Sequence, residues 1–243
     1  MVLFSLTSCS EDTEEIVIAA AANVQYPVQE IIDSFKNRYN ISIRTVYGSS
    51  GKLTAQVLAG ANFDVFISAD TLYPKKISAE HKSVYPPRVY AYGHLILWST
   101  KYKKDELWKV LGNGEFDHLP IANPKIAPYG VAAMDVINHL VAYDKISDKL
   151  VLGESVSQVN QFIHTGAADL GITASSISYL SAFKNVGDWI SIPDSLYQSI
   201  VQSAILISQP ETKHDWSEKF YQYLFGEEAR EILRNFGYSL PEL

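Results

Sequence analysis

Short apolar runs alternate along this chain with segments whose apolar residues recur every three or four positions. The runs predict buried strands, and the recurring positions predict amphipathic helices. The first helix of this kind carries Val28, Ile31, Ile32 and Phe35 at the spacing i, i+3, i+4, i+7, with Pro27 in its first turn. An alternation of strand and helix over most of a chain predicts an α/β fold.

The expected strands share a continuous apolar stretch and cover residues 16–20, 41–47, 64–70, 89–98, 119–122, 149–152, 169–173 and 203–207. The expected helices share a periodic apolar face and carry residues 28–35, 53–58, 131–141, 156–163, 215–225 and 227–236. The run at 89–98 is long enough to be the first candidate for a crossing between lobes. Gly60 and Gly237 are expected to end helices, since glycine is the usual residue after a helix C-terminus.

A chain of 243 residues is longer than a typical single domain, and two lobes of about 100 residues each are expected. We predict two open, mostly parallel sheets flanked by helices, with the second lobe inserted in the first. The first lobe is expected to comprise residues 16–88 and 201–243, and the second residues 89–200. Residues 1–15 are interpreted as the remnant of a signal and a tether.

The turns that follow the strands are made of small, uncharged residues. Ile16 to Asn23 and Ile43 to Gly51 both run from an apolar strand through such a turn into a helix. A helix that opens in this way exposes unpaired N–H groups and the positive end of its dipole, which favour an anion. Four helix N-termini of this kind, at Asn23, Ser50, Tyr129 and Val156, come two from each lobe. Ligands of open α/β sheets bind where such termini converge, so we expect an anion site in the cleft between the lobes.

The composition limits the classes of function. The net charge is −7 and the basic residues are dispersed, which argues against nucleic acid as a partner. An acidic chain can still bind an anion, because the local dipoles and N–H groups decide the site. No apolar run approaches the ~20 residues of a membrane-spanning helix. The single cysteine excludes an internal disulfide and cysteine-rich zinc patterns.

Motifs for catalysis or metal binding are incomplete. Gly48 to Leu53 lacks one glycine and the final Ser or Thr of a phosphate-binding P-loop, and it lacks the last glycine of a hydrolase elbow. The six histidines are scattered without metal-ligand spacing. Asp64 and Asp70 bracket one strand and are interpreted as structural, and Lys52 as a solvated side chain. We therefore expect no enzyme, with a small hydrolase as the remote alternative, and no cofactor or metal cation.

Neutral donors also bear on selectivity among oxyanions. Molybdate, tungstate and sulfate are fully deprotonated near neutral pH, whereas phosphate retains a proton and benefits from a carboxylate acceptor. No Asp or Glu lies at the apex of any of the four turns. Phosphate is therefore disfavoured relative to the three dianions. The choice between sulfate and the larger anions depends on cavity size and stays open at this point.

Five segments carry a resemblance to a known family: residues 19–23, 47–53, 60–70, 122–130 and 237–238. In this order they resemble the periplasmic molybdate-binding proteins of ABC importers, over residues 16–240. The resemblance implies a type II-like periplasmic binding fold with molybdate or tungstate held in the cleft between the lobes, without a cation. It also implies a monomer that delivers the anion to membrane permease subunits. The implied ligand-binding residues are Ala22, Asn23, Ser50, Tyr129 and Val156.

Two positions depart from the commonest family pattern. Asn23 stands where most members have serine, and Ala174 stands where some members supply a tyrosine hydroxyl. The missing donor is expected to be replaced through Tyr129 or Asn23. Tyr129 and Val156 are expected to bind the anion through their N–H groups, so that replacing either side chain with alanine costs little.

The N-terminal segment carries a further resemblance. Leu6-Thr-Ser-Cys9 follows the apolar residues Val2 to Phe4 and precedes the polar stretch from Ser10 to Glu15. This order resembles the lipobox of bacterial lipoproteins, whose cysteine is lipidated. It implies an extracytoplasmic protein anchored to a membrane through Cys9. The alternative is an N-terminal tail without a lipid.

Overall fold

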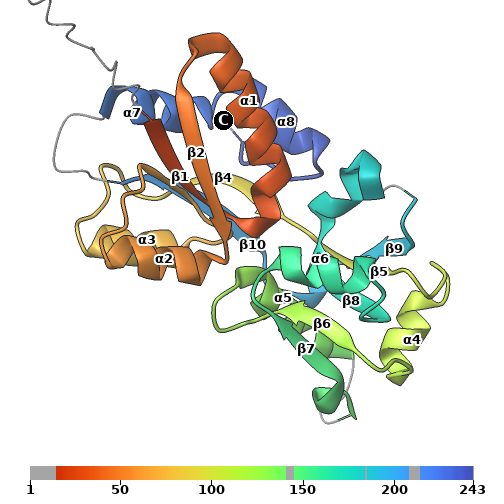
Figure 1. Cartoon of the computed structure of the whole chain (residues 1–243). Coiled ribbons are helices and arrows are strands. Elements are labelled where there is room, and N and C mark those ends of the chain that lie inside the picture. Colours follow the sequence, from red (N-terminus) through yellow and green to blue (C-terminus); the bar gives the residue numbers. More distant parts are fainter. Residues whose placement is uncertain (1–14, 141–144, 184, 208–213, 243) are drawn as a thin grey trace, which may run out of the picture.

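The computed structural model describes residues 15–140, 145–183, 185–207 and 214–242. The described chain forms two lobes, and the α/β two-lobed fold expected from the sequence is confirmed (Figure 1). Cys9 lies outside the described residues, so the structure has no bearing on its lipidation.

The first lobe is built on a five-stranded sheet in the order β2-β1-β3-β10-β4. Its strands are β1 (Glu15–Ala21), β2 (Ser42–Gly48), β3 (Val65–Ile67), β4 (Arg88–Gly93) and β10 (Ile200–Leu206). Its helices are α1 (Gln25–Tyr39), α2 (Ser50–Leu58), α3 (Leu72–Ala79), α7 (His214–Tyr223) and α8 (Glu227–Asn235). Helices α1, α7 and α8 cover one face of the sheet, and α2 and α3 cover the other (Figure 1).

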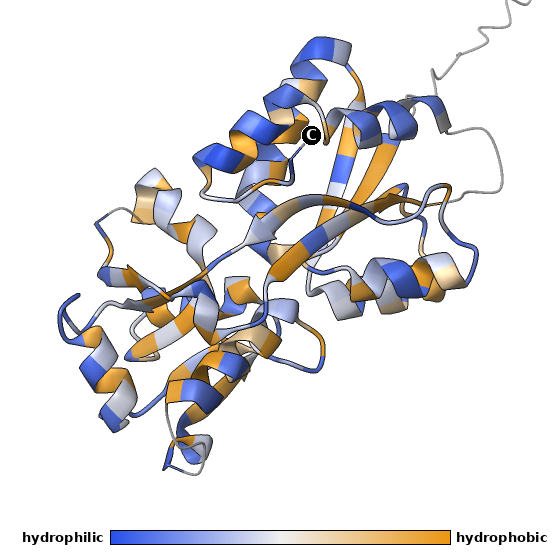
Figure 2. Cartoon of the chain, turned by 180° about the vertical axis from the view of Figure 1, so that it is seen from behind, coloured by the Kyte–Doolittle hydropathy of each residue, from blue (hydrophilic) through white to orange (hydrophobic). Residues whose placement is uncertain are grey.

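Strand β1 is buried on both faces, which explains its continuous apolar sequence. Ile16 and Ile18 belong to the core cluster that includes α1 and α8, whereas Val17 and Ala19 belong to the cluster that includes α2 and α3. Successive side chains point to opposite faces of a strand, so both helical layers pack on the same seven residues. Figure 2 shows apolar residues concentrated on the strands and hydrophilic residues over much of the helices.

The second lobe contains a three-stranded sheet in the order β8-β5-β9 and a parallel pair, β6-β7. Its strands are β5 (Leu95–Ser99), β6 (Leu119–Ala122), β7 (Leu150–Gly153), β8 (Leu170–Ala174) and β9 (Asp188–Ser191). Its α-helices are α4 (Leu107–Asn113), α5 (Pro128–Leu140) and α6 (Val156–His164). Short 3₁₀ helices in the chain are η1 (Ala22–Val24), η3 (Ser147–Lys149), η4 (Ser175–Tyr179), η5 (Ser181–Phe183) and η6 (Asp194–Leu196).

Parallel pairing is less extensive than expected. Strand β1 is parallel to β2 and β3, and β6 is parallel to β7. Strand β10 runs antiparallel to β3 and β4 because the chain returns through it from the second lobe. Strand β5 is antiparallel to both of its neighbours. The sheets are therefore mixed, and the parallel pairs bring the carboxyl ends of β1, β2 and β3 to one edge.

The prediction of a single strand at 89–98 is wrong, since the structure has two strands there, β4 and β5. Residues up to Gly93 pair with β10 in the first sheet, and residues from Leu95 pair with β8 and β9 in the second. A continuous apolar run suits a buried strand in either sheet, so its pattern does not show where the chain passes from one sheet to the other. The pairing favours a lobe boundary near His94 over one at Val89, and the division into 16–88, 89–200 and 201–243 otherwise stays a prediction.

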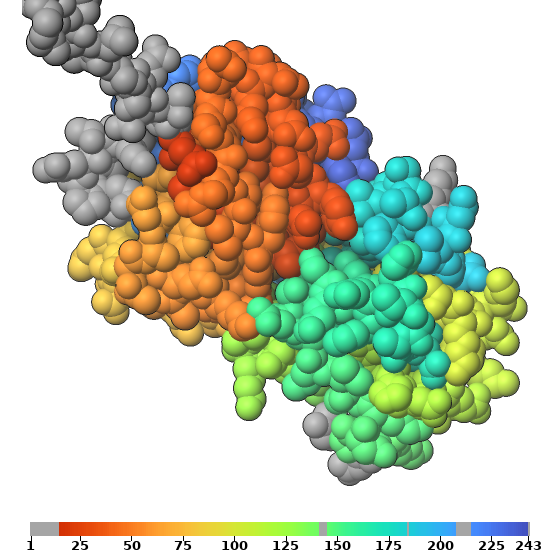
Figure 3. Space-filling model, viewed as in Figure 1, coloured from red at the N-terminus to blue at the C-terminus, as the bar shows by residue number. Residues whose placement is uncertain are grey.

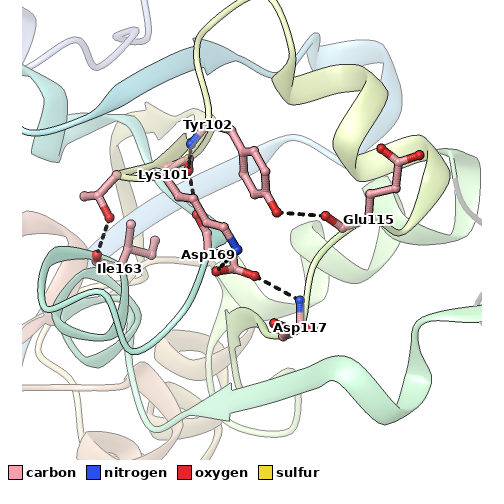
Figure 4. A network of polar contacts seen from close by, with 8 residues as sticks. Lys101, Tyr102, Glu115, Asp117, Ile163 and Asp169 are labelled. Atoms are coloured by element: carbon pink, nitrogen blue, oxygen red, sulfur yellow. Dashed lines mark hydrogen bonds and ion pairs between the residues drawn. The ribbon is translucent and has the colours of Figure 1, made fainter.

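A polar network at the far end of the second lobe joins its loops (Figure 4). The Asp169 carboxylate accepts hydrogen bonds from Lys101 Nζ at 2.8 Å and from the Asp117 N–H at 3.0 Å. The Tyr102 hydroxyl donates to the Glu115 carbonyl at 2.9 Å. Partial burial opposes ionisation of Asp169, but the Lys101 and Asp117 donors lower its pKa. The network is a structural element of the lobe and does not line the cleft.

Candidate functional site

The first helix N-terminus of the site follows β1 directly. The 3₁₀ turn η1 starts at Ala22 and runs into α1, so the first N–H groups of this segment have no partner within the helix. Ala22 and Asn23 both lie at this end and are buried. Their N–H groups are therefore available to a group in the cleft.

The second N-terminus is that of α2, which begins at Ser50 after the N-cap position Ser49. The Ser50 hydroxyl oxygen accepts the Ala69 N–H at 3.0 Å, and Ala69 follows β3 in the same sheet. The hydroxyl proton of Ser50 is thereby left for another acceptor. The Ser49 hydroxyl is buried and has no hydrogen-bond partner among the residues that the structure describes.

The other two N-termini belong to the second lobe. Helix α5 begins with Pro128, which has no N–H, so the N–H of Tyr129 is the first donor of that helix. Helix α6 begins at Val156 after the N-cap position Ser155. Ser155 makes no capping hydrogen bond. Its extended backbone leaves the hydroxyl and the Val156 N–H at the end of the helix.

These four N-termini converge on one pocket between the lobes. All five residues predicted to bind a ligand line it, and the lining residues are Ala21, Ala22, Asn23, Gly48, Ser49, Ser50, Ala69, Ala127, Pro128, Tyr129, Ser155 and Val156. Its empty space is small, about 210 Å³ including the solvent at its open side. Of the described residues that line it, none carries a charge. The pocket therefore suits a small anion held by N–H and O–H donors.

A buried polar cluster lies behind the pocket and holds Asn23. The amide nitrogen of Asn23 donates to Gln202 Oε1 at 2.7 Å and to the Tyr238 hydroxyl at 3.2 Å, with a longer contact of 3.4 Å to the Tyr129 hydroxyl. The Asn23 carbonyl accepts hydrogen bonds from the Tyr238 hydroxyl at 2.7 Å and the Ser176 hydroxyl at 2.9 Å. These contacts fix the backbone whose N–H faces the pocket.

The tyrosines of this cluster remain neutral donors over the physiological pH range. Burial raises the pKa of Tyr238 to about 12. It also raises the pKa values of Tyr129 and of Tyr90, whose hydroxyl donates to Gln202 Oε1 at 3.0 Å, well above 10. A neutral hydroxyl beside Asn23 adds no negative charge near an anion site. The electrostatics of the pocket are therefore set by dipoles and not by a titrating side chain.

The Tyr129 side chain has a structural role besides its N–H, and the expectation that its removal costs little affinity stays a prediction. This side chain is buried, contacts Asn23, and fills the space above Gly93, where a Cβ would collide with its hydroxyl. Truncation to alanine would leave a large cavity in the wall of the site. The Val156 side chain is also buried, so truncating it disturbs packing. The role of the Val156 N–H is tested by a substitution that removes this donor.

Lys52 is exposed, in agreement with its interpretation as a solvated side chain. Its ammonium forms an ion pair with Glu154 at 2.5 Å, and the two residues come from different lobes. Asp64 and Asp70 are structural, as expected. Asp64 accepts the Val17 N–H at 2.6 Å, and Asp70 accepts the Tyr73 N–H at 3.1 Å in the first turn of α3.

Within the described residues, no group of three or more His, Cys, Asp and Glu side chains is placed to hold a metal ion. Ala174 ends β8 in a buried position and is not among the lining residues. The tyrosine hydroxyls that lie closest to the first turn are those of Tyr129 and Tyr238, both bonded to Asn23.

Sequence reasoning missed Ser49, Ser155 as a lining residue, and the supporting residues Gln202 and Tyr238. The two serines stand at N-cap positions, where a hydroxyl without a capping bond is a usable signal for a ligand. Gln202 lies far along the chain from Asn23 and offered no comparable pattern, whereas Tyr238 belongs to a segment of the family resemblance to which no role was assigned.

The fold and the uncharged inter-lobe pocket are those of a solute-binding protein, and comparisons with known proteins agree. Residues 16–239 match the family of bacterial extracellular solute-binding proteins, and the chain belongs to this family. Among the residues that the structure describes, no helix combines the length and apolar character needed to cross a membrane.

Named relatives are more specific. The chain is 36% identical to the molybdate-binding protein ModA of Azotobacter vinelandii, over 97% of this chain and 94% of that protein. It is 37% identical to ModA of Rhodobacter capsulatus, over 92% of this chain and 88% of that protein. The solved structure of the Azotobacter vinelandii periplasmic molybdate-binding protein superposes with a TM-score of 0.87 at 32% identity, and the match covers 93% of this chain and 100% of that one.

Proposed function

We propose that this chain binds molybdate or tungstate outside the cytoplasm and delivers it to an ABC importer. The observation that carries the proposal is the convergence of four helix N-termini on one uncharged pocket, lined by Ala22, Asn23, Ser50, Tyr129 and Val156. The named similarity to molybdate-binding proteins over nearly the whole chain supports the choice of anion.

The proposed binding mode uses donors only. The Ser50 hydroxyl, whose oxygen already accepts the Ala69 N–H, donates its proton to one anion oxygen. The N–H groups of Ala22, Asn23, Tyr129 and Val156 surround the remaining oxygens. Hydrogen bonds to a charged group are roughly twice as strong as neutral ones, so a few such donors hold a dianion without a cation.

Sulfate and phosphate are the alternative ligands. The absence of a carboxylate among the described lining residues disfavours phosphate, because its proton would have no acceptor there. Sulfate shares the charge and shape of molybdate, and only cavity size separates the two. No nucleophile with a paired base faces the pocket from the described residues, which favours a binding protein over a small hydrolase.

Titration calorimetry with molybdate, tungstate, sulfate and phosphate tests the proposal on the purified protein. One molybdate or tungstate per chain, bound more tightly than sulfate and phosphate, is the expected result. A preference for sulfate or phosphate over molybdate would contradict the assigned specificity. Turnover of ester substrates that is abolished by Ser50→Ala would instead assign a hydrolase.

The proposed partners are the membrane permease subunits of the importer, met by a monomer of this chain. Analytical ultracentrifugation with and without molybdate tests the monomer directly, and a stable dimer at micromolar concentration would contradict it. Permease subunits would recognise the two lobes in their closed arrangement.

Lipidation of Cys9 is proposed as the membrane anchor. The resemblance of Leu6 to Cys9 to a lipobox supports it, and the polar stretch after it would serve as a tether. Expression behind an intact signal in a bacterium should place the protein in the membrane fraction, and Cys9→Ala should release it. An equal distribution of both forms would remove the anchor from the account.

A further inference from the structure

Gly51 is the second residue of α2, and its N–H does not face the proposed anion site. It donates to the carbonyl of Ile126 at 2.9 Å, which belongs to the loop before α5 in the other lobe. One N–H group in the first turn of α2 thus binds the backbone of the second lobe. Figure 3 shows the surface of the N-terminal part of the chain in contact with that of its middle part.

The backbones approach closely because residue 51 has no side chain. A Cβ at this position would lie 2.9 Å from the Ile126 carbonyl oxygen, 3.0 Å from Ile126 Cα and 2.7 Å from the Tyr73 hydroxyl. Gly51 is not among the glycines with positive φ, so its backbone conformation suits any residue. The requirement for glycine is therefore steric, and it arises from the backbone of Ile126 in the other lobe and from the Tyr73 hydroxyl in the same lobe.

The loop that meets Gly51 has little freedom to yield. The Asn123 carbonyl accepts the N–H groups of Ile126 at 3.1 Å and Ala127 at 2.9 Å. The Asn123 side chain also accepts the Lys125 N–H at 3.0 Å. An added methyl group at residue 51 would thus displace a loop held by three hydrogen bonds, or keep the lobes apart.

A second contact accompanies the first. The Tyr73 hydroxyl donates to the Lys125 carbonyl at 3.3 Å, and we call this bond and the Gly51–Ile126 bond the clasp. The nearby ion pair of Lys52 and Glu154 is half exposed, with 45% and 55% of the side chains accessible. Exposed ion pairs of this kind contribute little to stability and are screened by salt. The contact between the lobes at this point therefore depends on the two hydrogen bonds of the clasp, both of which go to backbone carbonyls.

We infer that Gly51 is a positioning residue that lets the two lobes close around the anion. Gly51 adjoins Ser50, and Ile126 lies three residues before Tyr129, so the clasp sets the spacing between two helix N-termini that line the pocket. With the clasp broken, the donors of the two lobes are less well positioned to bind one anion together. This inference rests on the proposed function.

The position has an opposite effect on the helix itself. Glycine in a helix is less favourable than alanine, so Gly51→Ala should strengthen α2 while it obstructs closure. A purely structural role for Gly51 would move stability and affinity in the same direction. The clasp predicts that they move in opposite directions.

The test compares Gly51→Ala with Gly112→Ala by molybdate calorimetry, stopped-flow release and small-angle scattering. Gly112 is the matched control because it also lies in a helix, α4, and a Cβ there meets no atom within 4 Å. Gly51→Ala should weaken binding at least about tenfold, through faster release, and should reduce the compaction caused by molybdate. Its ligand-free melting temperature should not fall. Gly112→Ala should leave affinity and compaction at the wild-type values.

A second variant keeps the inference testable if Gly51→Ala folds poorly. Tyr73→Phe removes the other bond of the clasp without adding an atom, and it should weaken molybdate binding about 2- to 10-fold. Wild-type affinity and compaction in Gly51→Ala or in Tyr73→Phe would overturn the clasp and leave the proposed function standing. A wild-type protein that binds none of the four oxyanions would instead count against the proposed function.

Discussion

The Ala69 N–H donates to the hydroxyl oxygen of Ser50 across 3.0 Å, from the end of β3 to the start of α2. This bond occupies a lone pair of the hydroxyl oxygen and leaves the hydroxyl proton free to donate to a ligand. Both residues line the inter-lobe pocket. Ser50 is therefore oriented as a donor before any ligand arrives, which is what an acceptor-only dianion requires.

Replacement of Ser50 by alanine should weaken molybdate binding by roughly 10- to 150-fold. A hydrogen bond to a charged group is worth ~1.5–3 kcal/mol, and this range converts to that loss of affinity. Calorimetry measures it directly. An affinity within twofold of the wild type would show that the hydroxyl does not contact the anion.

Replacement of Ser49 by alanine should separate binding from stability. The Ser49 hydroxyl is buried without a partner among the described residues, so its removal relieves an unsatisfied group in the ligand-free protein. We expect an unchanged or raised melting temperature without ligand, and an affinity for molybdate lowered about tenfold or more. A lower melting temperature together with wild-type affinity would assign Ser49 to packing alone.

Much of the first lobe could be predicted from the sequence because its strands and helices have strong periodic patterns. The helix starts at Ser50 and Val156 agree with the structure, since small residues after an apolar strand mark them well. The two serines of the Gly-Ser-Ser-Gly turn were not separable by pattern. Their difference arises from Ala69, which reaches one hydroxyl and not the other.

The rest of the site depends on contacts between distant parts of the chain. Asn23 meets Gln202 and Tyr238 across 179 and 215 positions, and no local pattern encodes such pairs. Helix α3 carries a proline at its third position, α4 is short, and β9 has a mixed sequence, so all three escaped prediction. Burial and sheet choice are decided there by the tertiary structure.

A comparison of two substitutions at Val156 tests whether the α6 N-terminus holds the anion. Val156→Pro deletes the N–H at the first helical position, where proline is tolerated, and Ser155 already has the extended backbone that precedes proline. Val156→Ala shortens the buried side chain but keeps the donor. We expect the proline variant to bind molybdate at least about tenfold more weakly than the alanine variant. If circular dichroism shows that both variants are folded and their affinities are similar, the α6 N-terminus does not bind the anion.

Alkaline pH should destabilise the folded protein through its buried tyrosines. Tyr238 loses its proton near pH 10 when unfolded but only at about pH 12 when folded, because burial raises its pKa. Below pH 10 both states keep the proton, and stability does not depend on this group. Between pH 10 and 12 only the unfolded chain releases it, so the folding equilibrium constant falls up to about tenfold per pH unit. Urea unfolding at stepped pH should show a smaller decline for Tyr238→Phe, and an equal decline would contradict the assignment.

In anomalous diffraction at the molybdenum absorption edge, from crystals grown with molybdate, we expect one strong peak per chain in the pocket between Ser50, Tyr129 and Val156, within hydrogen-bond reach of their donors. A molybdenum peak elsewhere on the molecule, or none in crystals saturated with molybdate, would contradict the proposed site.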